Sequence, residues 1–250
     1  MYFRHLKYKW QKFGLIDPLW SILALDNKYG RKWEVEEFFR TGEKEIAELT
    51  KTIDAISPDF KKRRALDFGC GVGRLTQPLS SAYETVCGID VAPSMIDLAK
   101  KYNRHCNCRY ILNARPDLKI FSDGNFDLIY SNITLQHMEK KFMIGYLREF
   151  FRILDDGGIL VFQIAGEPKE KPRSSFLREV IKKIIPFFVL DEYRRLRYGR
   201  LNMDIYGLKK AEVYELVDSF GGRVVKCEEN DIVVSWTSFR YFVVKKSTSI

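Results

Sequence analysis

Apolar residues in the first two thirds of the chain follow two periods, which predict two kinds of element. Between Glu34 and Ile56 they recur at helical spacing, which predicts an amphipathic helix that stops at Ser57-Pro58. Further along, short apolar runs alternate with helical patterns. We expect strands at 64–68, 84–89, 108–112, 126–131 and 159–165, and helices at 74–82, 93–103 and 139–154. This alternation predicts a parallel sheet with helices on both faces.

The last third of the chain carries a different pattern. Residues 174–185 alternate apolar and charged pairs, which predicts an amphipathic helix with a basic face, and residues 209–220 predict another helix. Residues 223–228 and 233–244 have the pattern of two strands close in sequence. Such strands favour an antiparallel pair at one side of the sheet.

The expected fold is therefore α/β. It consists of a Rossmann-like, doubly wound, mostly parallel seven-stranded sheet with a C-terminal antiparallel strand pair, an N-terminal helical arm and a helical basic insert. We expect the arm at 1–57, the main domain at 58–250 and the insert at about 167–205. With 46% hydrophobic residues, the 250-residue chain has enough apolar material for a sizeable core.

Charge and cysteine content indicate the compartment of the protein and the kinds of site it can hold. The net charge of +9 lies in two segments, residues 1–20 with +3 and residues 169–200 with +6. The sequence shows no apolar export signal and no apolar run of the ~18 residues that a membrane span requires. The five cysteines are odd in number and have no paired spacing, so we expect reduced thiols in a cytoplasmic protein. We expect no metal site, because ligands one residue apart in HCNC do not match zinc spacing.

The two basic segments have two interpretations. They could bind phosphates, acidic substrates or an anionic membrane surface, or they could form an ordinary solvated surface. The helix expected at 174–185 could likewise pack its apolar face on the domain, or lay it on an anionic bilayer beside the run RRLRYGR. The bilayer alternative predicts peripheral contact with the membrane and a lipid-linked or membrane-proximal acceptor.

Three glycines at alternate positions follow the first predicted strand. Gly69, Gly71 and Gly73 can adopt backbone angles closed to other residues and let a ligand approach the main chain. The pattern D-x-G-x-G-x-G begins at Asp67, whose carboxylate would repel a pyrophosphate but suits a cationic ligand. Asp90 ends the second strand, 17 residues after Gly73, where a carboxylate can accept hydrogen bonds from both ribose hydroxyls. Alternatively, Asp90 caps the next helix.

Four segments within about residues 60–166 resemble, in order and near-usual spacing, the motifs of class I S-adenosylmethionine-dependent methyltransferases. They are ALDFGCGVGRLT, GIDVAPSMIDLAKK, FDLIYSNITLQHM and YLREFFRILDDGGILVFQI. The opening FGLIDPLWSILALDNKYGRKWEVEEFFRTGEKEI and the ending of the chain also resemble a methyltransferase-type-11-like group. Its bacterial members are often associated with small-molecule or surface-glycan pathways.

The resemblance implies that S-adenosyl-L-methionine is the cofactor and S-adenosyl-L-homocysteine the product. It implies that Asp67, Gly69, Gly71 and Gly73 surround the methionine part of the cofactor and that Asp90 binds the ribose. It places Met95 and its neighbours, Val91 among them, at the adenine, and Asn113 and Ala114 at the adenine edge. It places Ser131 and Asn132 near the transferable methyl group. Many relatives carry Asp where Asn113 stands, but an amide can still bond to the exocyclic amine.

Methyl transfer from a sulfonium needs mainly an aligned acceptor and a dry site. His137, in SNITLQHM, is our candidate base for a hydroxyl acceptor, since it follows the fourth strand and its ordinary pKa suits proton transfer. Alternatively, His137 fixes the start of the next helix by hydrogen bonding. Asp204, Tyr206 and Trp236 could line an acceptor pocket, or serve as a cap and as packing.

We expect a methyltransferase that acts on a small-molecule, glycan or lipid-linked acceptor, by O-methylation. An RNA methyltransferase that uses both basic segments is one alternative, made less favourable by the absence of an N-P-P-[YF] motif. Another is a cofactor-binding partner of a different enzyme, without its own turnover. A nicotinamide oxidoreductase is disfavoured by the glycine spacing and by Asp67. The acceptor half of the site carries no motif that identifies the acceptor.

Overall fold

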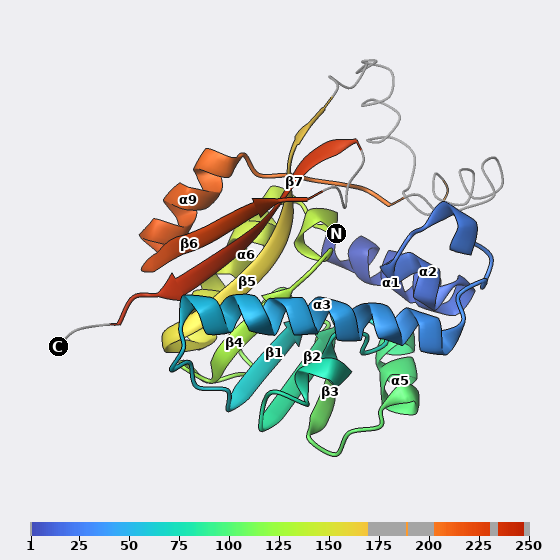
Figure 1. Ribbon diagram of the computed structural model, residues 1–250. Helices are drawn as coiled ribbons and strands as arrows, with labels where there is room; N and C mark the ends of the chain where they lie inside the picture. The colour runs from blue at the N-terminus through green and yellow to red at the C-terminus, as the bar shows by residue number, and fades with distance from the viewer. Residues whose placement is uncertain (1, 170–188, 190–202, 231–234, 248–250) are drawn as a thin grey trace, which may run out of the picture.

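The computed structural model describes residues 2–169, 189, 203–230 and 235–247 (Figure 1). The helix expected at 174–185 and most of the basic insert lie outside the described residues. The elements in chain order are α1 (Tyr2–Ile16), α2 (Pro18–Ile22), η1 (Asp26–Lys28), α3 (Val35–Ile56), β1 (Arg64–Phe68), α4 (Thr76–Leu79), β2 (Thr85–Asp90), α5 (Pro93–Tyr102), β3 (Cys108–Leu112), β4 (Phe126–Ser131), η2 (Leu135–His137), α6 (Lys140–Ile153), β5 (Leu154–Pro168), α9 (Lys210–Ser219), β6 (Gly222–Glu229) and β7 (Trp236–Lys245).

The strands form one seven-stranded sheet in the order β3-β2-β1-β4-β5-β7-β6. The first five strands of that order pair in parallel, and β7 runs antiparallel to both β5 and β6. This architecture confirms the expected Rossmann-like sheet with its C-terminal antiparallel pair. Because β1, β2 and β4 are parallel neighbours, Phe68, Asp90 and Ser131 end at the same edge of the sheet.

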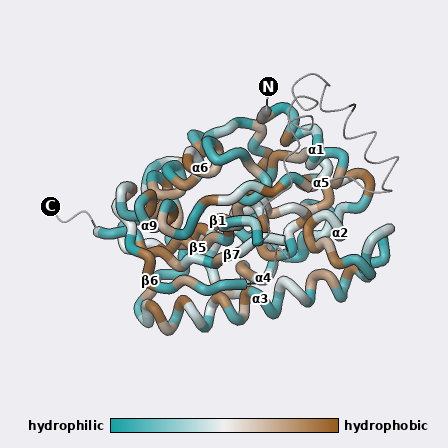
Figure 2. Tube along the Cα trace, turned by 90° about the horizontal axis from the view of Figure 1, so that it is seen from above, coloured by the Kyte–Doolittle hydropathy of each residue, from teal (hydrophilic) through white to brown (hydrophobic). Residues whose placement is uncertain are grey.

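Helices cover both faces of the sheet, with α3 on one side and α6 on the other in the view from above (Figure 2). Strand residues alternate between the two faces, as the period of two requires. On the α6 side, Leu66 and Ile129 pack with Phe150 in a core that includes residues of α9. On the α3 side, Ala65 and Leu128 of the strands pack in a second core with helix residues such as Leu49.

Two elements differ most in length from the sequence expectation. The helix expected at 74–82 is only α4, since the N–H groups of Ser80 and Tyr83 donate to carbonyls of α4 in turns that end it. Strand β5 is longer than expected at both ends. It gains Leu154, which pairs with Phe126, and Pro168, which pairs with Trp236 of β7.

The N-terminal arm packs directly against the glycine loop. Helix α3 crosses the face of the sheet in Figure 1, and it contains Gly42 at the point of closest approach. A Cβ on Gly42 would overlap the backbone carbonyl oxygen of Arg74, which follows the third glycine of the loop. The missing side chain therefore lets α3 approach the loop closely.

We predict that Gly42→Ala destabilises the protein, although Ala is ordinarily the better helix former. The added methyl group would push α3 away from the carbonyl of Arg74 and lower the free energy of unfolding by about 1–3 kcal/mol, as for other overpacked sites. Chemical denaturation monitored by circular dichroism measures this change.

Gly145→Ala is the matched control. Gly145 lies within α6 and has no heavy atom within 4 Å of the position its Cβ would take. This substitution should raise stability by roughly 0.5–1 kcal/mol. Stabilisation by both substitutions would contradict a close contact between α3 and the glycine loop.

Candidate functional site

A cavity lies where β1, β2 and β4 end. Its walls come from the glycine loop, from the ends of β2, β3 and β4, and from α1 and α2 of the arm. The lining residues are Phe3, Leu6, Trp10, Ser21, Ile22, Phe68, Gly69, Cys70, Gly71, Arg74, Leu75, Ile89, Asp90, Val91, Met95, Asn113, Asn132, Ile133, Thr134, Met138 and Tyr146.

The three glycines of the loop all have positive φ, with values of 78° at Gly69, 52° at Gly71 and 88° at Gly73. The N–H groups of Gly69 and Cys70 both donate to the carbonyl of Ile89, which ties the loop to β2. Gly69 and Gly71 line the cavity, whereas Gly73 packs against the ring of Tyr110. The structure thus gives the first two glycines a place at the site and the third a packing role.

Asp90 lies in the cavity wall with both carboxylate oxygens bonded to the backbone. One oxygen accepts from the N–H of Gly71 at 3.0 Å, and the other accepts from the N–H of Ala92 at 2.9 Å. Ala92 is the N-cap residue of α5, so this bond ties the end of β2 to the start of α5 without capping a free N–H group of the helix. Burial raises the pKa of Asp90 to about 6, although these N–H donors partly oppose the rise.

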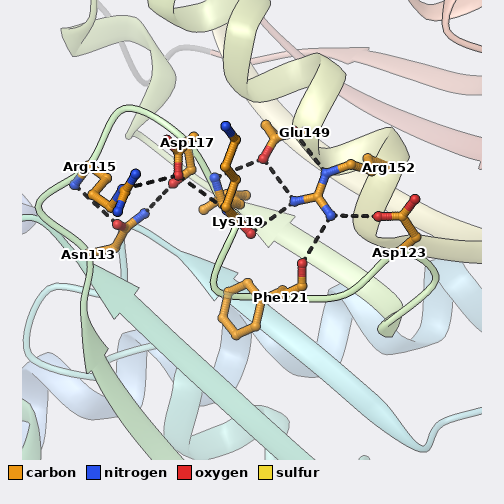
Figure 3. A network of polar contacts seen from close by, with 9 residues as sticks. Asn113, Arg115, Asp117, Lys119, Phe121, Asp123, Glu149 and Arg152 are labelled. Carbon is orange, nitrogen blue, oxygen red and sulfur yellow. Dashed lines mark hydrogen bonds and ion pairs between the residues drawn. The ribbon is translucent and has the colours of Figure 1, made fainter.

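Asn113 lines the cavity, but its amide is engaged in the loop that follows β3 (Figure 3). The Nδ2 group donates to the carbonyl of Asp117 at 2.8 Å, and Oδ1 accepts from the N–H of Arg115. Ala114 is exposed and lies outside the described lining. The structure therefore brings Asn113 to the cavity and leaves Ala114 outside its described lining.

Arg152 of α6 forms hydrogen bonds with the loop between β3 and β4 (Figure 3). Its guanidinium donates to the carbonyls of Leu118 and Phe121 and to the carboxylates of Asp123 and Glu149. Glu149 in turn accepts from the N–H of Leu118. This network fixes the chain between β3 and β4, and with it the cavity wall at Asn113.

The turn after β4 contains a strained residue on the cavity wall. Ile133 has a φ of 56°, which is rare for a β-branched side chain. Its N–H donates to Oε1 of Gln163, whose Nε2 donates to Gln136 and Ser238. Gln163 is polar inside an apolar strand, a signal in the sequence that could have identified it, whereas nothing in the sequence indicates Ile133.

Glu45 of α3 is the functional candidate that sequence reasoning missed. One carboxylate oxygen accepts from the hydroxyl of Tyr130 at 2.5 Å and from Nδ2 of Asn132 at 2.6 Å. The other accepts from Nη2 of Arg74 at 2.8 Å. Asn132 and Arg74 line the cavity, and Ser131 lies buried beside them, outside the lining. Glu45 therefore connects the arm to both sides of the site.

His137 is buried away from the cavity. Its Nδ1 lies 2.9 Å from the carbonyl oxygen of Asp204, which can only accept, so Nδ1 carries the proton. Its Nε2 lies 3.4 Å from the amide nitrogen of Gln136. Burial lowers the pKa of His137 to about 4, and Trp10 covers the ring. This geometry favours the positioning alternative over general-base catalysis.

The three residues considered for an acceptor pocket have other surroundings. Asp204 pairs with Lys9 of α1 at 2.6 Å, Tyr206 packs against the core on the α6 side, and Trp236 pairs with Pro168 in the sheet. Asp67, predicted near the methionine part, does not line the cavity. Its carboxylate is fully buried and accepts from the hydroxyl of Thr76 at 2.6 Å.

Asp67 predicts a pH dependence of stability. Burial raises its pKa from 3.8 to about 7, so the folded chain holds this proton more tightly than the unfolded chain does. Its contribution to stability is therefore present at low pH and is lost as the pH rises from about 4 to 7. The free energy of unfolding of Asp67→Asn should therefore rise relative to that of the wild type between pH 5 and pH 8, by on the order of 2 kcal/mol.

Urea unfolding at several pH values measures this difference, with Asp218→Asn as the control. Asp218 is exposed, and the ion pair with Lys246 lowers its pKa, so its removal should not change how stability varies with pH in that range. Parallel stability curves for Asp67→Asn and the wild type would show that Asp67 keeps an ordinary pKa.

Comparisons with known proteins agree with this geometry. Residues 66–162 match a family described as a methyltransferase domain. The chain is 24% identical over 191 residues to a phosphoethanolamine N-methyltransferase of Triticum aestivum, covering 70% of this chain and 37% of that enzyme. It is 28% identical over 153 residues to a malonyl-[acyl-carrier protein] O-methyltransferase of Bacillus anthracis, covering 60% and 55%. The chain thus spans less than two thirds of either relative.

A similar fold is found in the magnesium protoporphyrin IX methyltransferase of Synechocystis, solved with bound S-adenosylhomocysteine. The TM-score is 0.63 at 16% identity, over 97% of this chain and 99% of that one. The family match begins within β1 and ends within β5, and so includes the glycine loop, Asp90 and Asn132. The chain therefore carries a class I S-adenosylmethionine-dependent methyltransferase domain.

Proposed function

We propose that the protein transfers the methyl group of S-adenosyl-L-methionine to a small-molecule, glycan or lipid-linked acceptor. The observation that carries this proposal is the place of Asp90. Its carboxylate lies in the cavity wall at the end of β2, held by the N–H of Gly71 in the positive-φ glycine loop. An acidic side chain at this point suits a ribose, and the family match includes it.

The residues around the cavity fit the parts of this cofactor. Gly69 and Gly71 offer bare backbone, and a Cβ on Gly71 would lie 2.5 Å from Cδ1 of Ile22. Backbone N–H groups bond to both oxygens of Asp90, and a carboxylate has about four acceptor sites, so it can also accept from a hydroxyl. Oδ1 of Asn132 is buried without a hydrogen-bond partner, as suits a wall that binds a polar ligand.

The cofactor supplies an activated methyl group on a sulfonium. The task of the protein is to align the acceptor and to exclude water. Phe3, Leu6 and Trp10 of α1 and Ile22 of α2 close the cavity with apolar side chains. This enclosure favours a small acceptor with an apolar part over a nucleic-acid strand.

The lining also bears on the atom that is methylated. Among the described lining residues, Asp90 is the only carboxylate and no histidine is present. An acceptor oxygen that is already ionised or readily ionises, such as that of a carboxylate or a phenol, needs no base from these described residues. We therefore retain O-methylation as the proposed reaction and assign His137 to positioning the turn after β4.

Calorimetric titration tests the proposed cofactor. We expect S-adenosyl-L-methionine and S-adenosyl-L-homocysteine to bind and NAD not to bind. Asp90→Ala should weaken both adenosyl ligands by at least about tenfold, the value of a charge-assisted hydrogen bond. Asp97→Ala removes an exposed carboxylate of α5 outside this cavity and should bind like the wild type. Equal affinity of Asp90→Ala and the wild type would rule out the ribose role.

We also propose contact with an anionic membrane surface. The insert lies outside the described residues, and the support comes from the arm, where Leu15 is 60% exposed and Ile16 is 41% exposed. Arg31 donates to the carbonyls of both residues, which places a cation beside this apolar tip. Exposed apolar side chains next to cations suit a bilayer with anionic lipids. Among the described residues, no helix is both long and apolar enough to cross a membrane.

Vesicle co-sedimentation tests this contact with phosphatidylcholine alone and with added phosphatidylglycerol. We expect binding only with the anionic lipid, and a loss of several-fold in Leu15→Ser/Ile16→Ser, because fewer apolar groups enter the bilayer. Ile120→Ser alters an exposed apolar residue outside the arm and should change nothing. Binding that ignores the anionic lipid content would contradict the proposal.

A further inference from the structure

Residues 203–208 run along η2 and β5, and backbone hydrogen bonds hold them there. The N–H of Tyr206 donates to the carbonyl of Gln136 at 2.7 Å, and the N–H of Leu208 donates to the carbonyl of Ala165 at 3.0 Å. These partners belong to η2 and β5, which are part of the main domain. The segment therefore offers a fixed support to whatever packs against it.

Helix α1 is tied to this support by an ion pair. Nζ of Lys9 lies 2.6 Å from Oδ2 of Asp204, and the Lys9 side chain is only 6% exposed. A buried ammonium group that loses its counter-ion is strongly destabilising, so the pair determines where this part of α1 lies. The carbonyl of Asp204 also accepts from Nδ1 of His137, which anchors the counter-ion to η2.

The turns of α1 around this ion pair form a wall of the cavity. Leu6 and Trp10 are about one helical turn apart, and both line two spaces, the cavity and a smaller void beside the ion pair. Phe3, about a turn nearer the N-terminus, also lines the cavity, and its ring lies 5.8 Å from that of Phe142. The position of this wall therefore depends on the ion pair.

The C-terminal half of α1 has a separate anchor on α5. The N–H of Ser94 donates to Oε1 of Gln11 at 3.0 Å, and its hydroxyl donates to the carbonyl of Gln11 at 3.2 Å. A Cβ on Gly14 would overlap Oγ of Ser94, so the two helices are in close contact there. Loss of the Lys9 pair should therefore loosen the N-terminal turns and leave the C-terminal half in place.

We propose that Lys9 and Asp204 are positioning residues that hold α1 closed over the cavity, and that ligand exchange requires this ion pair to open. Apolar contacts are non-directional, whereas a buried ammonium group has a stable place only beside its counter-ion. Opening is then a conformational step before ligand entry and release. The part of this inference that concerns an adenosyl ligand rests on the proposed function, whereas the part that concerns the position of α1 does not.

Hydrogen exchange of the protein without ligand tests the position of α1. Lys9→Met keeps a long unbranched side chain in the buried position and removes the charge. We expect the amides of residues 6–10 to exchange at least about tenfold faster in this variant, and those of α5 to stay within about threefold of the wild type. Asp204→Asn should have a similar effect, and the double variant should add little, because both substitutions remove one interaction.

Arg4→Met is the matched control. Arg4 is an exposed cation of the same helix, outside the cavity lining and outside the Lys9 pair. This variant should exchange like the wild type. Thermal unfolding of every variant measures global stability, because a general loss of stability would speed exchange throughout the chain.

Stopped-flow mixing with S-adenosylhomocysteine tests the role in ligand exchange. Tryptophan emission follows binding, since Trp10 lies in the cavity wall. In Lys9→Met we expect the association and dissociation rate constants both to rise at least about fivefold, and the Kd to change less than about threefold, because opening precedes both entry and release. A substitution that only weakened a ligand contact would raise the dissociation rate constant alone.

The outcomes separate this inference from the proposed function. Wild-type exchange of residues 6–10 in folded Lys9→Met, or an equal rise in exchange throughout the chain, would show that the pair does not hold α1 closed. A rise in the dissociation rate constant alone would overturn the role in ligand exchange. A wild-type protein that binds no S-adenosylhomocysteine would overturn the proposed cofactor, while faster exchange confined to residues 6–10 would still support the position of α1.

Discussion

The arm, the glycine loop and the fourth strand all meet at the carboxylate of Glu45. Its partners Arg74, Tyr130 and Asn132 are far from it in sequence, so none of these contacts forms locally. Arg74 is almost fully buried, and a buried guanidinium without a carboxylate would be strongly destabilising. The three segments therefore depend on one another for their positions.

Because these segments depend on one another, the residues within the methyltransferase match do not form the cavity alone. Residues 66–162 supply the glycine loop, Asp90 and the turn after β4. The opposite wall comes from α1 and α2, which lie outside that match, and Lys9 of α1 also pairs with Asp204 beyond it. The cavity is thus built from segments inside and outside the family match.

Local pattern was enough to predict the sheet, because each strand is a short apolar run between turn residues. The spans of β1, β3 and β4 agree with the expectation, and so does the antiparallel pair at the C-terminus. The site was predictable where chemistry follows a motif, as at Gly71 and Asp90. It was not predictable at Glu45, which lies among exposed acidic residues on an amphipathic helix and differs from them only through tertiary contacts.

Asn113 and His137 show a second reason why the sequence predicts only part of the site. Their residue types suited an adenine contact and a base. In the structure, both ends of the Asn113 amide are bonded within a loop, and the His137 imidazole is bonded to the carbonyl of Asp204 and lies beside the amide of Gln136. Hydrogen-bonding capacity is visible in a sequence, but the partner that uses it is not.

Burial also affects the ionisation of two carboxylates at the carboxyl end of the sheet. Desolvation raises the pKa of both Asp67 and Asp90, so each carboxylate is ionised at a cost in the folded chain. Of the two, Asp90 lines the cavity, whereas Asp67 accepts a hydrogen bond from Thr76 inside the protein. Direct contact with a ligand in the cavity is therefore open to Asp90 and not to Asp67.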